Sequence, residues 1–320
     1  MTTLSVLVPT YERTEFLRDA IDSVLAQTFG DFVVLVGDNS RSDAVERVIA
    51  EYDDERIHYH RNTVELGTQG NFVDLVRRAE TPLVATMHDD NLWDPEFLAT
   101  LVPPMLSEPD VAASMSDFWT IDEHGSRLVT LTESNSLRTH RSVLPQCRIE
   151  PDLVFGLRMV AAWCLPSLAV SAVLRTDFVR AVEFHDEYSP LYDLWLGYEF
   201  VKAKRAFRYD PRRLACHREH SGSLTAAGIG ECEDRIFACI LAEQPDAGVV
   251  LDEIRGYRGW LRWGRGRNAM LAQDITRSQT EFGLAAEDLS GFRRVLAVAI
   301  SRNRIAWAAA RVGLIAMGRL

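Results

Sequence analysis

The stretch "LSVLVPTYERTEFLRDAIDSVLAQTFGDFVVLVGD", residues 4–38, decides the fold. Its two ends are apolar, β-branched runs, residues 4–9 and 32–38, each with the length of a buried strand. Between them, apolar side chains recur at helical spacing, at Phe16, Leu17, Ala20, Ile21, Val24 and Leu25. A strand, a helix and a second strand in this order predict two parallel strands joined by a crossover helix.

The same alternation continues to about residue 110. Helical patterns cover residues 44–52 and 71–79, and short strand-like runs cover residues 57–60 and 82–87. Strands that alternate with helices at this spacing predict an α/β fold, with a mixed, mainly parallel Rossmann-like sheet flanked by helices.

Beyond residue 110 the pattern changes. The segment "DEHG" predicts a hairpin turn that Asp122 and Gly125 serve, and the polar segment 133–152 is predicted to be a mobile loop. The remaining predicted elements are a strand running into a helix over residues 166–178, an amphipathic helix over 192–205, a short strand over 206–211, and helices from about Gly230 to the end.

Composition limits the classes of function. The 320 residues, 47% of them hydrophobic and 25% charged, are enough for a large core. A net charge of −11 argues against nucleic acid as a partner. Because no apolar run reaches membrane-spanning length and no charged segment precedes an apolar one at the start, we expect a cytoplasmic protein. The five cysteines lack CxxC spacing, so neither a disulfide framework nor a zinc site is expected.

The charge is spread unevenly along the chain. Residues 254–320 contain 12 arginines and 4 acidic residues, a net charge of +8 against −19 for the rest. The last 29 residues, "FRRVLAVAISRNRIAWAAARVGLIAMGRL", have helical periodicity. Two alternatives stay open for this basic helical tail: it lies on an anionic membrane as a peripheral contact at the inner face, or it packs on the acidic body or on a second copy in a homodimer.

Three polar clusters follow predicted strands: "PTYER" (9–13), "GDNSRSD" (37–43) and "HDDN" (88–91). In parallel sheets ligands bind at the carboxyl ends of the strands, although caps and turns would explain any single cluster. Adjacent carboxylates such as Asp89 and Asp90 repel each other unless a cation joins them, and Mg²⁺ or Mn²⁺ prefers oxygen ligands. A metal-bridged diphosphate is therefore the expected ligand, with Asp38 accepting from a base or ribose and Tyr11 stacking on the base.

Four blocks of the chain resemble family 2 glycosyltransferases of the GT-A fold. Residues 4–43 are similar to the family opening, near VSVIIPTYNR…SVLAQT…IVVDDGSTD, and residues 66–98 resemble the block that ends in its metal-binding DXD motif. The segments "PSLAVSAVLRTDF…FHDEYSPLYDLWLGYEF" and "CHREHSGSLT" (216–225) are similar to the acceptor segment and the closing element. The resemblance covers residues 4–225, with the blocks in the family's order.

The resemblance implies an inverting glycosyltransferase that moves a sugar from a nucleotide-diphosphate donor, UDP- or dTDP-linked, to an acceptor hydroxyl. Its domain would span residues 1–228, with a nucleotide-binding half (1–110) and an acceptor half (111–228), followed by a helical extension over 229–320. The implied cofactor is Mn²⁺ or Mg²⁺. The acceptor is open among a saccharide, a lipid-linked sugar and a natural product.

The resemblance also implies roles for individual residues. Asp38 would read the base, Asp89 would lie beside the ribose or diphosphate, and Asp90 would coordinate the metal, while the remaining nucleotide-pocket positions are Pro9, Thr10, Tyr11 and Asn71. For Asn71 a packing role stays open, and Gly67 is expected to permit a tight turn before a helix.

Two departures from the family pattern concern the metal and the base. His88 stands where the first DXD carboxylate is usual, and Asn91 stands at the usual fourth acidic position, so we expect looser metal binding or a metal held mostly by phosphates and water. The family's "DDGS" is "GDNS" here, which keeps only its second aspartate, Asp38.

Asp193, directly before "LW" in the acceptor segment, is the candidate general base, with a structural role at a helix start as the alternative. Pro190 and Leu191 replace the Glu-Asp pair that many members carry before it. His220 is a candidate metal or diphosphate ligand, with an ordinary surface or core position as the alternative. For three aromatic residues that could stack on a sugar, core packing is the expected role: Trp163, Tyr192 and Trp195.

Two alternatives to the glycosyltransferase interpretation stay open. Sugar-phosphate nucleotidyltransferases have a related architecture, but they carry a glycine-rich basic loop after the first strand, and "PTYERTEF" is not such a loop. A catalytically silent nucleotide-binding scaffold is the second alternative, because the His88 and Asn91 changes reduce the number of carboxylates.

Overall fold

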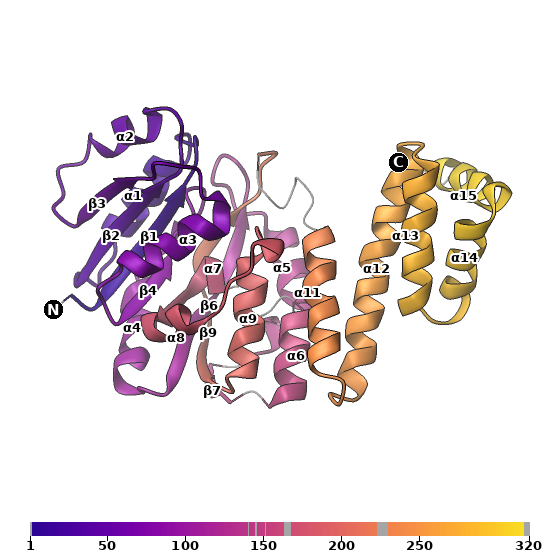
Figure 1. The fold of residues 1–320 in the computed structure, drawn as a ribbon. Coiled ribbons are helices and arrows are strands. Elements are labelled where there is room, and N and C mark those ends of the chain that lie inside the picture. Colours follow the sequence, from indigo (N-terminus) through magenta and orange to yellow (C-terminus); the bar gives the residue numbers. More distant parts are fainter. Residues whose placement is uncertain are drawn as a thin grey trace. The chain divides into compact units, whose positions relative to one another are not determined.

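The computed structural model describes residues 2–139, 141–144, 146–150, 152–162, 168–222 and 230–316, so Trp163 lies outside it. Contacts between Cα atoms divide the chain into two compact units, residues 1–227 and 228–320. The first unit is an α/β domain built on one sheet, and the second consists of helices (Figure 1).

The first half of the sheet is parallel. Its strands are β1 (Leu4–Thr10), β2 (Phe32–Asp38), β3 (Ile57–Arg61) and β4 (Leu83–Thr86), in the spatial order β3-β2-β1-β4. The chain moves outward from β1 to β3 and then returns to the other side of β1 for β4. This reversal puts the switch in strand order between β1 and β4, where sheets of this kind bind ligands.

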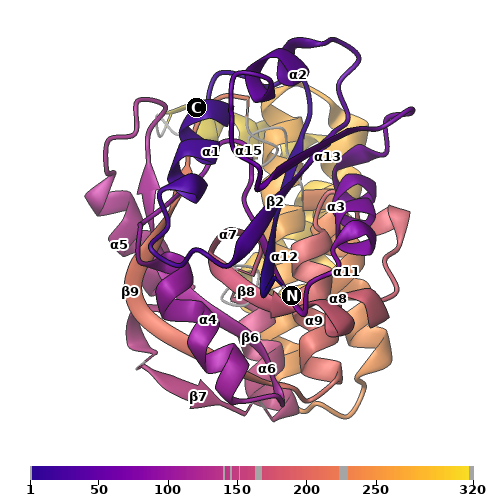
Figure 2. The same ribbon diagram turned by 90° about the vertical axis from the view of Figure 1, so that its left-hand side faces the viewer.

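Helices cover both faces of the parallel strands. Helix α1 (Leu17–Leu25) lies on one face and α3 (Gly67–Arg78) on the other (Figure 2), while the short α2 (Ala44–Ile49) leads into β3. The expected apolar stripe of α1 is buried against β1 and β2, where it meets Leu4, Val6, Val8, Val34 and Val36. Burial of both faces explains why these strands are continuous apolar runs. Gly67 begins α3 with φ +68°, as predicted for a turn residue.

The second half of the sheet is mixed. Strands β5 (Leu92–Trp93), β6 (Val111–Ile121), β7 (Cys147–Ile149), β8 (Ala172–Arg175) and β9 (Ala206–Arg218) complete the order β4-β8-β6-β9-β5, with β7 on β9. Strand β8 is antiparallel to both β4 and β6, whereas β6 and β9 are parallel. The helices of this half are α4 (Phe97–Ser107), α5 (Val129–Arg138), α6 (Leu153–Ala161), α7 (Leu168–Ser171), α8 (Thr176–Ala181) and α9 (Tyr192–Lys202), with 3-10 turns η1 (Arg141–Val143) and η3 (Asp186–Tyr188).

Two predictions for this half are corrected. The segment 133–152, expected to be a mobile loop, contains most of α5, the turn η1 and strand β7. Strand β9 runs 13 residues, far beyond the short strand predicted over 206–211. The hairpin turn was predicted correctly, since Asp122 Oδ1 accepts from the backbone N–H groups of His124 and Ser126, and Gly125 has φ +83°.

The second unit is helical, as predicted from Gly230 onward. It comprises α11 (Gly230–Glu243), α12 (Val249–Leu271), α13 (Ile275–Asp288), α14 (Gly291–Arg302) and α15 (Arg304–Ala316). Its core combines Met270 of α12, Phe282 and Ala286 of α13, Ala297 and Ile300 of α14, and Trp307 of α15. Across the described part of the chain, none of the helices combines the length and apolar character needed to cross a bilayer.

Candidate active site

The three strand-end clusters meet at one edge of the sheet. The register of β1 and β2 pairs Thr10 with Asp38, so "PTYER" and "GDNSRSD" begin side by side. Thr10 Oγ1 donates a hydrogen bond to Asp89 Oδ2 at 2.7 Å, which joins the "HDDN" cluster to the same edge. The predicted convergence of the three clusters is therefore present, at the switch in strand order.

Arg13 bridges the two carboxylates of "HDDN". Its Nη1 lies 2.8 Å from Asp89 Oδ1 and 2.5 Å from Asp90 Oδ2, and its Nη2 donates to the backbone oxygen of Gly222 at 3.2 Å. Two acidic oxygens thus converge on one nitrogen of a cation. The adjacent carboxylates are tolerated because a positive charge lies between them.

The environment distinguishes the two carboxylates. Burial raises the pKa of Asp89 to about 6, although the nearby Arg13 charge opposes this rise. For Asp90, burial also raises the pKa, but the surrounding cationic and hydrogen-bonding groups outweigh it, and the net shift is downward. The groups that lower the pKa of Asp90 are His88 first, then Arg13 and the hydrogen bond with His220. Burial in turn lowers the pKa of His88, and the Asp90 charge opposes that fall.

A contact across the domain joins the start of α9 to this edge. His88 Nε2 and Tyr192 Oη form a hydrogen bond of 3.0 Å between the end of β4 and the first residue of α9. Asp193 is the next residue, in the first turn of α9 and half-buried. Its Oδ1 accepts from the N–H of Leu194, so the alternative role at the helix start is also present. The start of α9, which carries Asp193, is therefore linked to the end of β4 by its first residue.

Asp38 is fully buried behind the rim. Its Oδ1 accepts from the backbone N–H of Ser40, and its Oδ2 accepts from Tyr59 Oη on β3, both at 2.7 Å. Each carboxylate oxygen keeps a second lone pair, although the residue has no exposed surface. Tyr11, the predicted stacking partner of a base, is 45% exposed.

Asn71 lies beneath the edge rather than on it. Its Nδ2 donates to the backbone oxygen of Gly37 at 2.7 Å, and its Oδ1 accepts from Asn62 Nδ2, with the residue 2% exposed. These bonds fasten α3 to the end of β2. The geometry favours the packing role that the sequence left open for Asn71.

The end of β9 closes the other side of the carboxylate pair. His220 Nε2 lies 3.2 Å from Asp90 Oδ2, and its ring packs 5.1 Å from that of Phe16. Arg218, 1% exposed, donates from Nε to the backbone oxygen of Asp90 and from its N–H to Asn91 Oδ1. Asn91 therefore supports the loop through its oxygen, while its buried Nδ2 has no hydrogen-bond partner in the described structure.

These residues fit a divalent cation in part. The oxygens of Asp89 and Asp90 already lie within 2.8 Å of a common cationic nitrogen, and an imidazole nitrogen stands beside Asp90. In the described residues, however, no group of three His, Cys, Asp or Glu side chains is arranged to hold a metal ion. Mg²⁺ is commonly held by one or two carboxylates together with substrate phosphates and water, and this donor set suits such an ion.

Two of the aromatic residues singled out from the sequence are core residues, as expected. Tyr192 stacks on Phe72 with 4.5 Å between ring centroids, and Trp195 packs against Tyr188 at 4.5 Å. Both Tyr192 and Trp195 are buried, so neither offers a free face to a sugar.

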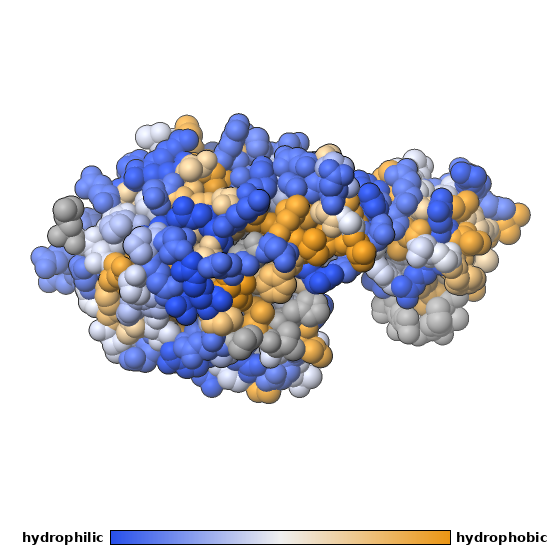
Figure 3. Space-filling model, turned by 90° about the horizontal axis from the view of Figure 1, so that it is seen from below, coloured by the Kyte–Doolittle hydropathy of each residue, from blue (hydrophilic) through white to orange (hydrophobic). Residues whose placement is uncertain are grey.

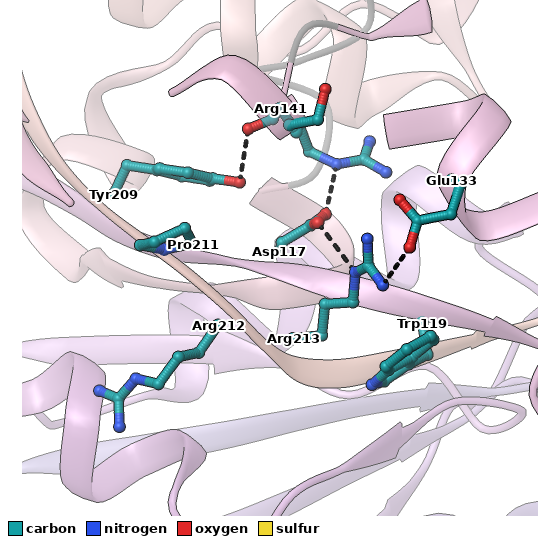
Figure 4. Close-up of a pocket in the computed structure, with 9 residues that line it drawn as sticks. Asp117, Trp119, Glu133, Arg141, Tyr209, Pro211, Arg212 and Arg213 are labelled. Carbon is teal, nitrogen blue, oxygen red and sulfur yellow. Dashed lines mark hydrogen bonds and ion pairs between the residues drawn. The ribbon is translucent and has the colours of Figure 1, made fainter. Parts of the chain in front are cut away.

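A separate cavity of about 490 Å³ lies between β6, β9, α5 and η1 (Figure 4). Asp117 pairs with Arg141 at 2.8 Å and with Arg213 at 3.2 Å, and Arg213 also reaches Glu133 at 2.9 Å. Because its arginines are paired with acids of the same wall, we assign no ligand to this cavity.

Sequence reasoning missed Arg13, Arg218 and Tyr59 as parts of the site. Arg13 lies within a quoted strand-end cluster, so its position at the rim was a usable signal. The contacts of Arg218 and Tyr59 join segments more than 20 residues apart, and single-sequence patterns do not carry such pairings.

The comparisons identify the family. The profile of glycosyl transferase family 2 matches residues 5–165, half of the chain, and the chain belongs to this family. The protein is thus a glycosyltransferase with a GT-A fold.

Relatives differ in how much they share with the chain. An uncharacterized glycosyltransferase of Rickettsia typhi is 20% identical over 72% of this chain and 68% of its own length. A Campylobacter jejuni enzyme named GalNAc(5)-diNAcBac-PP-undecaprenol beta-1,3-glucosyltransferase is 34% identical over 32% of this chain, which spans about a third (34%) of that protein. An Escherichia coli beta-1,3-glucosyltransferase, WfgD, named for UDP-Glc and a diphosphoundecaprenol acceptor, is 27% identical over 32% of this chain and 41% of its own.

Solved structures share the fold. S. aureus TarS in complex with UDP-GlcNAc matches with a TM-score of 0.66 and 14% identity, over 99% of this chain and 92% of that one. The mannosyltransferase PcManGT from Pyrobaculum calidifontis, in complex with GDP-Man and Mn²⁺, matches with a TM-score of 0.58 and 15% identity, over 98% and 85%.

Proposed function

We propose that this glycosyltransferase transfers a sugar with inversion from a nucleoside-diphosphate donor bound at the β1/β4 edge. The observation that carries the proposal is the convergence of Thr10, Asp38, Asp89 and Asp90 at that edge. Tyr11 would stack on the base and Asp38 would accept a hydrogen bond from it, with Pro9 and Thr10 along the nucleotide. An N–H of uracil, thymine or guanine fits Asp38 equally, so the base is left open.

Asp193 is the proposed general base. An acceptor hydroxyl attacks the anomeric carbon in line while Asp193 removes its proton, and the bond to the diphosphate breaks on the opposite face. The His88–Tyr192 hydrogen bond supports this role because it ties the start of α9, and thus Asp193, to the carboxylate edge. Asp90, with Asp89 and His220 beside it, would hold Mn²⁺ or Mg²⁺. When bound, such an ion would offset the negative charge of the departing diphosphate.

The acceptor that we propose is a lipid-linked saccharide. Two relatives are named as glucosyltransferases that act on diphosphoundecaprenol-linked sugars. A second support is the outer surface of α14 and α15, where exposed apolar side chains lie among arginines: Phe292, Val295, Ile305 and Val312. We call these four residues the outer stripe.

The outer stripe suits an anionic membrane. Its members recur at i, i+3 on α14 and i, i+7 on α15, whereas Ala297, Ile300 and Trp307 point into the helical core. From Leu289 to Ala316 the chain has five arginines and no acidic residue. Hydrophobic residues of the C-terminal unit are visible at its surface among hydrophilic ones (Figure 3). We therefore favour peripheral contact with anionic lipid over the homodimer for this surface.

Binding and turnover test the core proposal. Calorimetric titration with UDP, dTDP and GDP, each with and without Mn²⁺, should show one base bound and tighter binding with the metal. Donor hydrolysis and transfer to short lipid-linked acceptors should follow with the sugar of that nucleotide. No nucleotide affinity at any Mn²⁺ concentration would contradict the proposed site, and binding without turnover on a broad donor and acceptor panel would favour the silent scaffold.

A further inference from the structure

We propose that Arg13 is the resident cation of the carboxylate pair, and that metal and donor displace it so that its guanidinium pairs with the donor's diphosphate. This inference rests on the proposed function of the β1/β4 edge. It assigns to Arg13 a role in binding that neither the metal nor the aspartates supply.

The geometry gives the first support. Nη1 of Arg13 is held by Asp89 Oδ1 at 2.8 Å and by Asp90 Oδ2 at 2.5 Å, one oxygen from each carboxylate of the proposed metal site. A guanidinium nitrogen and a metal ion cannot occupy the point between the same two oxygens. Metal entry therefore requires that two charge-assisted hydrogen bonds be broken.

Arg13 is the most exposed of the three charged side chains in this cluster. Its side chain is 27% exposed, against 9% for Asp89 and 13% for Asp90, so it forms the solvent side of the cluster. Its second nitrogen already reaches the backbone oxygen of Gly222, beyond the carboxylates. A guanidinium at the mouth of the site is well shaped for bidentate pairing with phosphate oxygens.

The backbone before Arg13 holds it at this position. Glu12 has φ 53°, a left-handed conformation that is strained for a non-glycine residue. The Glu12 carboxylate accepts from the N–H groups of Arg41 and Ser42, and its own N–H donates to Ser40 Oγ at 2.6 Å. The "GDNSRSD" loop thereby compensates the strain and directs Arg13 toward the aspartates. Together with the contacts of Arg13 itself, these hydrogen bonds indicate a side chain held in one position, unlike an isolated ion pair on the surface.

The test measures Mn²⁺ binding to the full-length protein without nucleotide, by the paramagnetic resonance signal of free Mn²⁺ and by calorimetry. Arg13→Gln should bind Mn²⁺ about tenfold more tightly than wild type, because the competing cation is gone. With saturating Mn²⁺, the same variant should bind the preferred nucleoside diphosphate about tenfold more weakly, because it lacks the phosphate contact. Arg13→Lys, which keeps the charge, should fall between wild type and the glutamine variant in both measurements.

The matched control is Arg47→Gln, which removes an equal charge from an arginine paired with Asp43 on the neighbouring helix α2. It should change both affinities by less than about twofold, since exposed charges at a distance are screened. Equal or weaker Mn²⁺ binding by both folded Arg13 variants, checked by thermal unfolding, would overturn the inference while leaving the proposed function intact. Failure of wild type to bind either nucleotide or Mn²⁺ would instead reject the proposed function.

Discussion

At the scale of single residues, Asp89 and Asp90 are neighbours with different electrostatic environments. Asp89 is more deeply enclosed and shares Arg13 with Asp90, whereas Asp90 also faces His220. The raised pKa of Asp89 has a consequence for stability. A buried acid whose pKa rises on folding binds its proton more tightly in the folded state, so folding becomes less favourable as pH rises through the interval between the two pKa values.

We expect this effect in the metal-free protein between about pH 4, the ordinary pKa of Asp, and about pH 6, the folded value. Over that interval, wild type should lose about 2–3 kcal/mol of unfolding free energy relative to Asp89→Asn, which has no proton to release. Urea denaturation of both proteins in chelator at several pH values measures the difference. Parallel curves for the two proteins would show that Asp89 ionises normally.

At the same scale, the proposed role of Asp193 as general base predicts a specific kinetic effect of its replacement. Asp193→Asn should lower kcat by about 10²- to 10⁴-fold, because an amide cannot accept the acceptor's proton, and should leave donor affinity nearly unchanged. The matched control is Asp186→Asn, which alters an exposed acid of the same segment, in η3, and should keep near wild-type turnover. Steady-state kinetics with donor titration separates kcat from KM. Unchanged turnover in Asp193→Asn would remove the base assignment and leave only the helix-start role.

At the scale of secondary-structure elements, the close approach of α3 to β2 accounts for the altered "GDNS" block. A Cβ at Gly37 would lie 2.6 Å from Asn71 Oδ1 and 2.9 Å from Leu75. Asn71 must stay close, because its Nδ2 bonds the backbone oxygen of Gly37. The side chain that the family usually carries at this position cannot be accommodated unless Asn71 and Leu75 of α3 shift.

Gly37→Ala should therefore lower the unfolding free energy by about 1–3 kcal/mol, as overpacking does in a close-packed region. Gly30→Ala is the matched control, since a Cβ there meets nothing within 4 Å, and its effect should stay within about 0.5 kcal/mol. Chemical denaturation of the three proteins gives the comparison. A Gly37 variant as stable as the Gly30 variant would mean that α3 shifts freely.

The elements that sequence predicted well are those with buried apolar faces. Strand β2 has the predicted bounds, 32–38, because both its faces are covered and its residues are continuously apolar. Helix α5 was missed because its inward positions are polar: Thr132 Oγ1 accepts from the N–H of Thr120, and Ser136 Oγ bonds Asp117. No apolar periodicity marks such a helix.

Strand β9 was cut short for a different reason. Pro211 lies inside it and suggests an end, but the pairing with β6 passes from Asp210 directly to Arg213, so a bulge absorbs the proline. For the site, the strand-end rule located the rim and its acids from sequence. The hydrogen bonds that hold the site together, such as the one between His88 and Tyr192, join residues far apart in the chain, 104 positions in this case. Such pairings arise only in the tertiary structure, so the sequence pattern does not predict them.

At the scale of the whole molecule, the structure shows where the excess positive charge of the C-terminal segment lies. The arginine-rich segment is folded, with its apolar inner residues in the helical core and the outer stripe in solvent. Among the described residues, Phe292 at 78% and Ile305 at 79% are the two most exposed large apolar side chains. Exposed apolar groups among arginines bind an anionic bilayer by apolar insertion and by charge together.

Wild type should therefore co-sediment with vesicles that contain phosphatidylglycerol and not with pure phosphatidylcholine, and binding should weaken in about 0.5 M salt because the charge contribution is screened. Replacing the outer stripe, as Phe292→Gln, Val295→Gln, Ile305→Gln and Val312→Gln together, should weaken vesicle binding by about tenfold. The control replaces two equally exposed apolar residues elsewhere, Leu137→Gln with Val249→Gln, and should bind like wild type. If wild type ignores anionic vesicles and is instead a dimer that the four replacements dissociate, as measured by light scattering, the surface is a contact between copies of the chain and the membrane proposal is wrong.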